Sequence, residues 1–156
     1  MNLADTLRAD FILDDIRATD KAGLFCEMTD YLASRIDGID RDKVIQSLFD
    51  RERLGTTGIG HGVAIPHGKI KGLNEMVVVF GRSVRGVQYN SLDNMPAHLI
   101  FLIISPENSA AAHLKLLSSI SRLLKSHDLR LSLMKAAGRD EIYRIISDAE
   151  KSGWAV

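Results

Sequence analysis

Two histidines stand in one glycine-rich stretch of the chain, GTTGIGHGVAIPHGK, which runs from residue 55 to residue 69. A short apolar run separates His61 from His67. Three chemical interpretations compete for this stretch. The histidines could bind a metal ion, the glycines could cradle the phosphates of a nucleotide, or one imidazole could itself act as a nucleophile.

The glycine spacing argues against nucleotide binding. A P-loop needs a glycine, four further residues and then Gly-Lys-Ser/Thr. Here Gly62 and Gly68 are separated by five residues, and Ile70 stands where the magnesium-binding hydroxyl belongs. Gly58, Gly60 and Gly62 form a G-x-G-x-G series, but no strand of adequate length precedes them, as a dinucleotide fingerprint requires.

A metal site would have to use His61 and His67, with His113 as a third ligand. The chain contains no HExxH and no CxxC motif, and the glycine-rich stretch holds no carboxylate that could complete a ligand shell. We therefore expect neither a metal nor another cofactor. His61 lies between two glycines, and we expect it to be an exposed loop residue.

His67 is the better candidate for chemistry. Pro66 fixes the backbone before it and Gly68 leaves the backbone free after it, which predicts an imidazole at the tip of a strand, beside main-chain N–H groups open to an anion. The residues alone leave a second interpretation open, in which His67 is a turn histidine without a role.

His113 and Arg51 could meet an anion at His67. His113 is predicted near the start of a helix and in register with its apolar face, so that it points inward close to the positive end of the helix dipole. Arg51 is predicted to end the helix before the glycine-rich stretch. Each residue also has a structural interpretation, as a core-edge histidine and as a cation that complements a helix C-terminus. The apolar face beside His113 is predicted to be Leu114, Leu117, Ile120 and Leu124.

Hydrophobic spacing predicts two helices before the glycine-rich stretch. After a short strand or extended lead-in at 11–16, Thr19 or Asp20 can cap a helix with apolar residues at every fourth position. Asp40 can cap a second helix, and Gly55 stands where that helix needs a left-handed C-terminal residue.

Runs rich in β-branched and aromatic residues follow and predict strands. The run HLIFLIIS at 98–105 is apolar on both faces, which is typical of a central strand covered on both sides. A hairpin-like turn near Arg85 and Gly86 would require at least one antiparallel pair. The predicted strands are 63–65, 76–84, 86–89 and 98–105, and the later helices are predicted from Asn108 onward, over 129–137 and over 139–151.

Length and composition predict one α/β domain covering residues 1–156, with a mixed parallel/antiparallel β-sheet sandwiched between helices. The 20 Lys and Arg residues balance 20 Asp and Glu residues, and aromatic residues are few. These features argue against nucleic-acid binding, which needs a basic footprint or stacking platforms. The chain shows no signal-peptide core and no apolar run near the ~20 residues of a membrane-spanning helix. We expect a cytoplasmic protein without membrane insertion.

The segment from Arg51 to Lys69, RERLGTTGIGHGVAIPHGK, resembles the enzyme IIA domains of the bacterial phosphoenolpyruvate-dependent phosphotransferase system, mannitol/fructose class. It is most similar to the nitrogen-regulatory branch of that class, and the resemblance extends from about Leu7 to about Ile146. The IPHG motif, with an arginine sixteen residues upstream of its histidine, is the specific signal. His61 departs from the pattern, because relatives often carry asparagine or another polar residue there.

The resemblance implies that His67 accepts a phosphoryl group, that His113 contacts the phosphoryl oxygens and that Arg51 is a supporting cation. It implies an HPr-type phosphocarrier protein as the donor and regulatory proteins as targets, and it makes His61 a decoy acceptor to be tested. The expected function is that of a regulatory phosphocarrier. Two alternatives stay open: a sugar-transport IIA subunit that passes the group to a IIB domain, and a binding module that is never phosphorylated.

Overall fold

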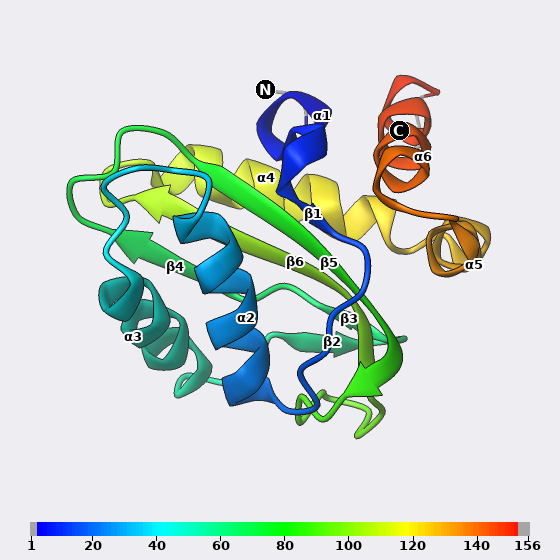
Figure 1. Ribbon diagram of the computed structural model, residues 1–156, viewed down its shortest axis with the longest axis horizontal. Coiled ribbons are helices and arrows are strands. Elements are labelled where there is room, and N and C mark those ends of the chain that lie inside the picture. The colour runs from blue at the N-terminus through cyan, green and yellow to red at the C-terminus, as the bar shows by residue number, and fades with distance from the viewer. Residues whose placement is uncertain (1–2, 153–156) are drawn as a thin grey trace.

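The computed structural model describes residues 3–152, which form a six-stranded mixed sheet with helices on both faces (Figure 1). Helices α2 and α3 cover the face seen in Figure 1, and α4 crosses the opposite face. The strands are β1 Ile12–Leu13, β2 Gly58–Gly60, β3 Val63–Ala64, β4 His67–Ile70, β5 Val77–Val87 and β6 Ala97–Pro106. The helices are α1 Leu3–Leu7, α2 Lys21–Ala33, α3 Arg41–Glu52, α4 Ala110–Leu123, α5 His127–Lys135 and α6 Arg139–Lys151, with a short 3₁₀ helix at Ala9–Phe11.

Strand β6 is the centre of the sheet, as its apolar sequence predicts. It pairs antiparallel with β5 along one side and parallel with both β3 and β4 along the other. The strand order is β1-β5-β6-β3-β2, and β4 continues beside β6 beyond the end of β3. The predicted mixed sheet between helices is confirmed. His67 is opposite Ile103, so the first residue of β4 lies next to this central strand.

The predicted hairpin turn at Arg85 and Gly86 is wrong. Both residues lie inside the continuous strand β5, where the register with β6 shifts between Arg82 and Val87. Gly86 has a φ of 96°, and glycine adopts this conformation both in tight turns and in β-bulges. The antiparallel pair is present, but residues 88–96 connect its strands.

Helices α2 and α3 start where their caps predict. The Asp20 side chain accepts a hydrogen bond from the Gly23 N–H at 2.8 Å, and the Asp40 side chain accepts one from the Lys43 N–H at 3.3 Å. Helix α3 ends at Glu52, and Gly55 follows with a φ of 143°. The chain therefore reverses beside the end of α3.

The predicted apolar face of α4 is confirmed at Ile120 and Leu124, which are buried, and it is wrong at Leu114. Leu114 is 66% exposed, whereas His113 is buried as predicted. Spacings of three and four fit two overlapping faces in a helix so rich in leucine, and packing against the sheet selects between them. The residues that α4 buries are His113, Leu116, Ile120 and Leu123.

The later elements differ from the predictions mainly at their ends. Helix α5 starts and ends two residues before the predicted range of 129–137, and α6 spans the predicted residues 139–151.

The short strands β2 and β4 were not predicted, because two of the three residues of β2 are glycines and β4 contains Gly68. Such runs lack the β-branched signal on which strand prediction rests.

Gly68 allows α3 to approach β4 closely. A Cβ atom added at Gly68 would lie 2.3 Å from the Oγ of Ser47 and 3.3 Å from its carbonyl carbon. Ser47 Oγ also donates a hydrogen bond to the Lys69 carbonyl at 3.1 Å, which ties α3 to the strand that begins at His67.

We therefore expect Gly68→Ala to lower the free energy of unfolding by about 1–3 kcal/mol, because the added methyl group overpacks this contact. Denaturant unfolding would measure the change. Ser47→Ala removes the nearest atom, so the double variant Ser47→Ala/Gly68→Ala should be less destabilised than the sum of the two single variants. Full additivity would show that the helix and strand do not meet here as described.

Candidate functional site

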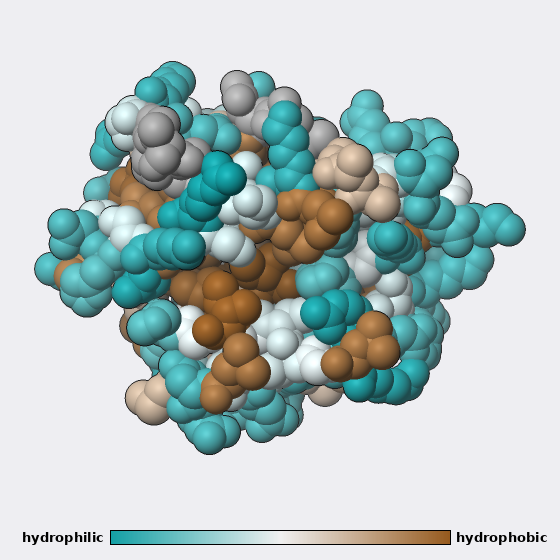
Figure 2. Space-filling model, turned by 180° about the vertical axis from the view of Figure 1, so that it is seen from behind, coloured by the Kyte–Doolittle hydropathy of each residue, from teal (hydrophilic) through white to brown (hydrophobic). Residues whose placement is uncertain are grey.

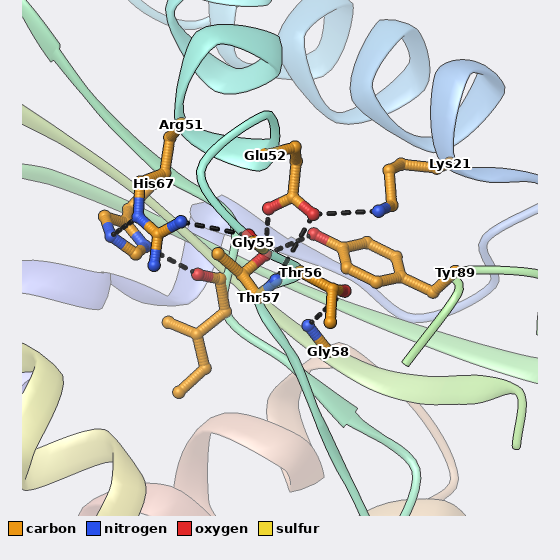
Figure 3. Close-up of polar contacts among 10 residues, drawn as sticks. Lys21, Arg51, Glu52, Gly55, Thr56, Thr57, Gly58, His67 and Tyr89 are labelled. Carbon is orange, nitrogen blue, oxygen red and sulfur yellow. Dashed lines mark hydrogen bonds and ion pairs between the residues drawn. The ribbon is translucent and has the colours of Figure 1, made fainter. Parts of the chain in front are cut away.

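Two hydrogen bonds hold the imidazole of His67 at the start of β4. Its Nδ1 lies 2.8 Å from the carbonyl oxygen of Ile65, and its Nε2 lies 3.1 Å from the Nε of Arg51 (Figure 3). A carbonyl can only accept, so Nδ1 carries the proton. A guanidinium N–H can only donate, so Nε2 presents its lone pair. The geometry thus fixes one neutral tautomer, in which Nε2 is the unprotonated and nucleophilic ring nitrogen.

Arg51 reaches His67 from the last turn of α3. Its Nη1 donates to the carbonyl oxygen of Gly55 at 3.0 Å while its Nε donates to His67. One guanidinium therefore braces the exposed chain reversal and also contacts the imidazole. The sequence prediction that Arg51 ends the helix and converges on His67 matches this placement.

His113 comes to the same place from α4 on the other face of the sheet. The centres of the His67 and His113 rings are 5.0 Å apart, and their planes are inclined by 55°. The hydroxyl of Ser105, at the end of β6, is hydrogen-bonded to His113 Nδ1. Nε2 is then the ring nitrogen of His113 without a hydrogen bond to any residue between 3 and 152, and it can serve a ligand.

An open cavity of about 430 Å³ lies over these three side chains. Lys69 adds a second cation to its lining, and the exposed side chains of Leu54 and Leu114 contribute apolar surface beside it. Figure 2 shows that apolar side chains also gather near the middle of the face opposite α2 and α3.

Both site histidines are shifted toward the neutral form. Burial lowers the pKa of His67, and the Arg51 charge lowers it further, while the Ile65 carbonyl and the Glu52 charge act in the opposite direction. Burial also lowers the pKa of His113 to about 4, with smaller contributions from the positive charges of His67 and Lys69. Near neutral pH the site therefore offers an unprotonated nucleophile beside fixed cations and a neutral imidazole.

His61 is not part of this site. It is exposed in the turn between β2 and β3, with a φ of 57°, and its backbone N–H donates to Asp93 at 3.0 Å. It lines a separate cavity of about 320 Å³ together with His98 and His127. Within residues 3–152, no group of three or more His, Cys, Asp or Glu side chains is arranged to hold a metal ion.

Sequence reasoning missed several residues of the site. Lys69 stands two positions after His67, and a cation at this spacing on a strand is a signal that could have identified it. Ser105 gave no such signal, because it follows a long apolar run and reaches His113 only through the tertiary fold. Ile65 acts through its backbone, so its residue type says nothing about its role.

Comparison with known proteins identifies the family. The model of the family described as phosphoenolpyruvate-dependent sugar phosphotransferase system, EIIA 2, matches residues 5–149. The protein belongs to this EIIA type 2 family. The chain is similar to a nitrogen regulatory protein of Bradyrhizobium diazoefficiens, with 34% identity over 147 residues that cover 94% of this chain and 95% of the relative.

Two further relatives of this EIIA type 2 protein bear on its role. A fructose-specific EIIABC component of Bacillus subtilis is 36% identical over 97% of this chain, which corresponds to only 24% of that longer protein. The crystal structure of the nitrogen regulatory protein IIA-Ntr from Neisseria meningitidis superposes with a TM-score of 0.85 at 32% identity, covering 92% of this chain and 98% of that one. None of the helices within residues 3–152 is long and apolar enough to cross a membrane.

The lowered pKa of His113 predicts a pH-dependent stability. Because His113 has a pKa of about 4 when folded and near 6.5 when unfolded, the unfolded state binds the proton first as the pH falls. The free energy of unfolding should therefore decrease as the pH falls below about 6.5, and this contribution should be fully lost below about pH 4.

Proton NMR titration of the His113 ring and denaturant unfolding at a series of pH values would test this prediction. His113→Gln should show a smaller decrease of stability with falling pH than the wild type. His127→Gln, which removes an exposed imidazole on α5, is the matched control and should follow the wild type. A His113 ring that titrates near 6.5 would contradict the prediction.

Proposed function

We propose that the protein is a phosphocarrier that accepts a phosphoryl group onto His67 Nε2 from a phosphohistidine on an HPr-type carrier. The observation that carries this proposal is the fixed tautomer of His67, whose Nδ1–H donates to Ile65 and whose Nε2 lone pair faces Arg51. This ring nitrogen is a nucleophile that needs no general base, because it is already unprotonated.

The transfer step balances without a net proton transfer. As the phosphoryl group enters, the Arg51 Nε–H releases the lone pair of His67 Nε2. Nε2 then forms a bond to phosphorus as the bond between phosphorus and the donor's ring nitrogen breaks, and the donor ring, which carries a proton on its other nitrogen, departs as a neutral imidazole. The positive charge that develops on the His67 ring is stabilised by the Ile65 carbonyl, which accepts the Nδ1–H. Both bonds are phosphorus–nitrogen bonds, so the exchange is nearly isoenergetic and alignment is the main task of the protein.

Arg51, His113 and Lys69 supply the charge and the donors that a phosphoryl group needs. The guanidinium is 3.1 Å from Nε2 before transfer, so a phosphoryl group that enters there meets its N–H groups. His113 stays neutral and donates through Nε2, while Ser105 holds its other ring nitrogen. Donors in fixed positions stabilise the transferring oxygens without reorganisation at the moment of reaction.

The relatives favour a regulatory role. The nitrogen regulatory protein of Bradyrhizobium diazoefficiens matches this chain over nearly the whole length of both. We propose that the phosphorylation state of His67 is read by regulatory protein targets in the cytoplasm. The similarity to a fructose-specific EIIABC component favours a second candidate, a sugar-transport IIA protein that passes the group to a IIB domain.

A labelling experiment tests the acceptor. The protein is mixed with enzyme I, an HPr-type carrier and labelled phosphoenolpyruvate, and we expect one acid-labile, base-stable phosphoryl group per chain. His67→Ala should accept none and keep its fold, whereas His61→Ala, the matched loop control, should accept as the wild type does. Label that persists in His67→Ala and disappears in His61→Ala would refute the assignment, and an unlabelled wild type would favour the binding module.

A second experiment adds a IIB domain to the labelled protein. Transfer of the label to the IIB domain would support the transport role, and its absence would support the regulatory role.

The role of Arg51 has its own test. If the guanidinium binds the transferring group, Arg51→Ala should slow single-turnover transfer by about tenfold or more, which is the loss expected from one charge-assisted hydrogen bond. Arg53→Ala, which truncates an exposed arginine two residues away, is the matched control and should transfer at the wild-type rate. Thermal unfolding must be measured alongside, since slow transfer with a large fall in Tm would assign Arg51 a purely structural role.

A further inference from the structure

A largely buried ion pair joins Lys21 to Glu52, the residue that follows Arg51 in the chain. Lys21, the first residue of α2, places its Nζ 2.8 Å from Glu52 Oε1, at the end of α3. The two side chains are only 17% and 6% exposed. Charges withdrawn this far from water persist only when they are paired and hydrogen-bonded, so the structure around Glu52 must satisfy it.

The carboxylate of Glu52 accepts hydrogen bonds from Thr57 as well as from Lys21. The Thr57 N–H donates to Oε1 at 3.2 Å, and the Thr57 hydroxyl donates to Oε2. The Tyr89 hydroxyl lies 2.7 Å from that of Thr57, and Lys21 Nζ lies 4.5 Å above the Tyr89 ring (Figure 3). Because the Thr57 hydroxyl donates its hydrogen to Glu52, the Tyr89 hydroxyl is the donor to Thr57. Burial and the Glu52 charge also raise the pKa of Tyr89, which keeps its proton.

These hydrogen bonds tie the last turn of α3, which contains Arg51, to Thr57. The chain reverses between Glu52 and Thr57, and residues 53–55 are all exposed, with Leu54 at 83%. These residues gain little from packing. Backbone hydrogen bonds from the Leu54 N–H to the Arg51 carbonyl and from the Gly55 N–H to the Glu52 carbonyl form the turn. Two side chains strengthen it: Arg51 donates to the Gly55 carbonyl, and Glu52 accepts from the Thr57 N–H and hydroxyl.

We propose that Glu52 is a positioning residue that sets the guanidinium of Arg51 against Nε2 of His67, with Lys21 compensating its charge. This inference rests on the proposed phosphoryl transfer. Arg51 and Glu52 are consecutive residues of the last turn of α3, so a displacement of the Glu52 backbone also displaces Arg51. A carboxylate is needed because its two oxygens accept three hydrogens here, whereas glutamine has one oxygen and adds two N–H donors beside Lys21 and Thr57.

The first test measures single-turnover transfer from the phosphorylated HPr-type carrier. Glu52→Gln should slow transfer by about tenfold, since small misplacements of a charge-stabilising group cost this much or more. Glu27→Gln is the matched control, because Glu27 also accepts two backbone N–H groups, those of Arg17 and Ala18, but at the turn before α2. It should transfer at the wild-type rate. Equal rates for Glu52→Gln and wild type would overturn the proposal.

The second test asks whether Glu52 acts through Arg51. In an Arg51→Ala background, Glu52→Gln should cause no further loss of transfer rate, because the group that it positions is gone. A further tenfold loss in that background would show that Glu52 acts independently and would overturn the proposal.

The third test separates positioning from stability. Lys21→Met/Glu52→Gln removes both charges and should regain stability relative to Glu52→Gln alone, because no unpaired ammonium stays buried. Its transfer rate should stay low, since the clamp on Thr57 is still weakened. Recovery of transfer together with Tm would overturn the positioning role.

A spectroscopic readout does not depend on phosphorylation. In the unphosphorylated protein, the ¹⁵N shift of His67 Nε2 and the Arg51 Nε–H resonance report the hydrogen bond between them. Both should change in Glu52→Gln and stay at wild-type values in Glu27→Gln. Unchanged resonances in Glu52→Gln would overturn the positioning role even if His67 is phosphorylated. If the wild type accepts no phosphoryl group, the proposed function fails while this measurement still decides the role of Glu52.

Discussion

The site depends on the two hydrogen bonds that fix the His67 ring. In one, the Nδ1–H of His67 donates to the carbonyl oxygen of Ile65, and in the other, the Nε–H of Arg51 donates to Nε2 of His67. They impose opposite requirements on the two ring nitrogens, so one neutral tautomer satisfies both. The remaining features of the site either hold these two partners in place or keep the imidazole neutral.

The sheet provides the first partner. Strands β3 and β4 both run parallel to β6, and the two residues between them lie close to the central strand, where Pro66 O accepts from the Ile103 N–H at 2.9 Å. The same central strand carries Ser105, which holds His113 on the face covered by α4. A Cβ atom at Gly68 would point toward Ser47 on α3, so the neighbouring His67 side chain points toward the α4 face, where its ring centre lies 5.0 Å from that of His113. The central strand therefore supports both histidines on the same face of the sheet.

Helix α3 provides the second partner, under a different constraint. Its C-terminus must deliver Arg51 to a half-buried imidazole although the following residues are exposed. The pair formed by Glu52 and Lys21 supplies the anchoring that apolar packing does not supply there. Burial and nearby cations then act in the same direction on both imidazoles, lowering their pKa values and leaving them unprotonated.

The sequence by itself predicted the fold class and offered Arg51, His67 and His113 as candidates for one site. The apolar run of β6 and the caps Asp20 and Asp40 are local signals, because each rests on a backbone preference or on periodicity within one element. The candidates Arg51, His67 and His113 lie on three elements, and the family motif linked them. The tertiary structure decided what depends on several elements at once. In the folded chain, Gly86 lies in a bulge of β5 and Leu114 is exposed. Ser105 and the Ile65 carbonyl contact the two site histidines, and Glu52 pairs with Lys21. These outcomes follow from contacts between residues far apart in the chain, and periodicity within one segment carries no information about them.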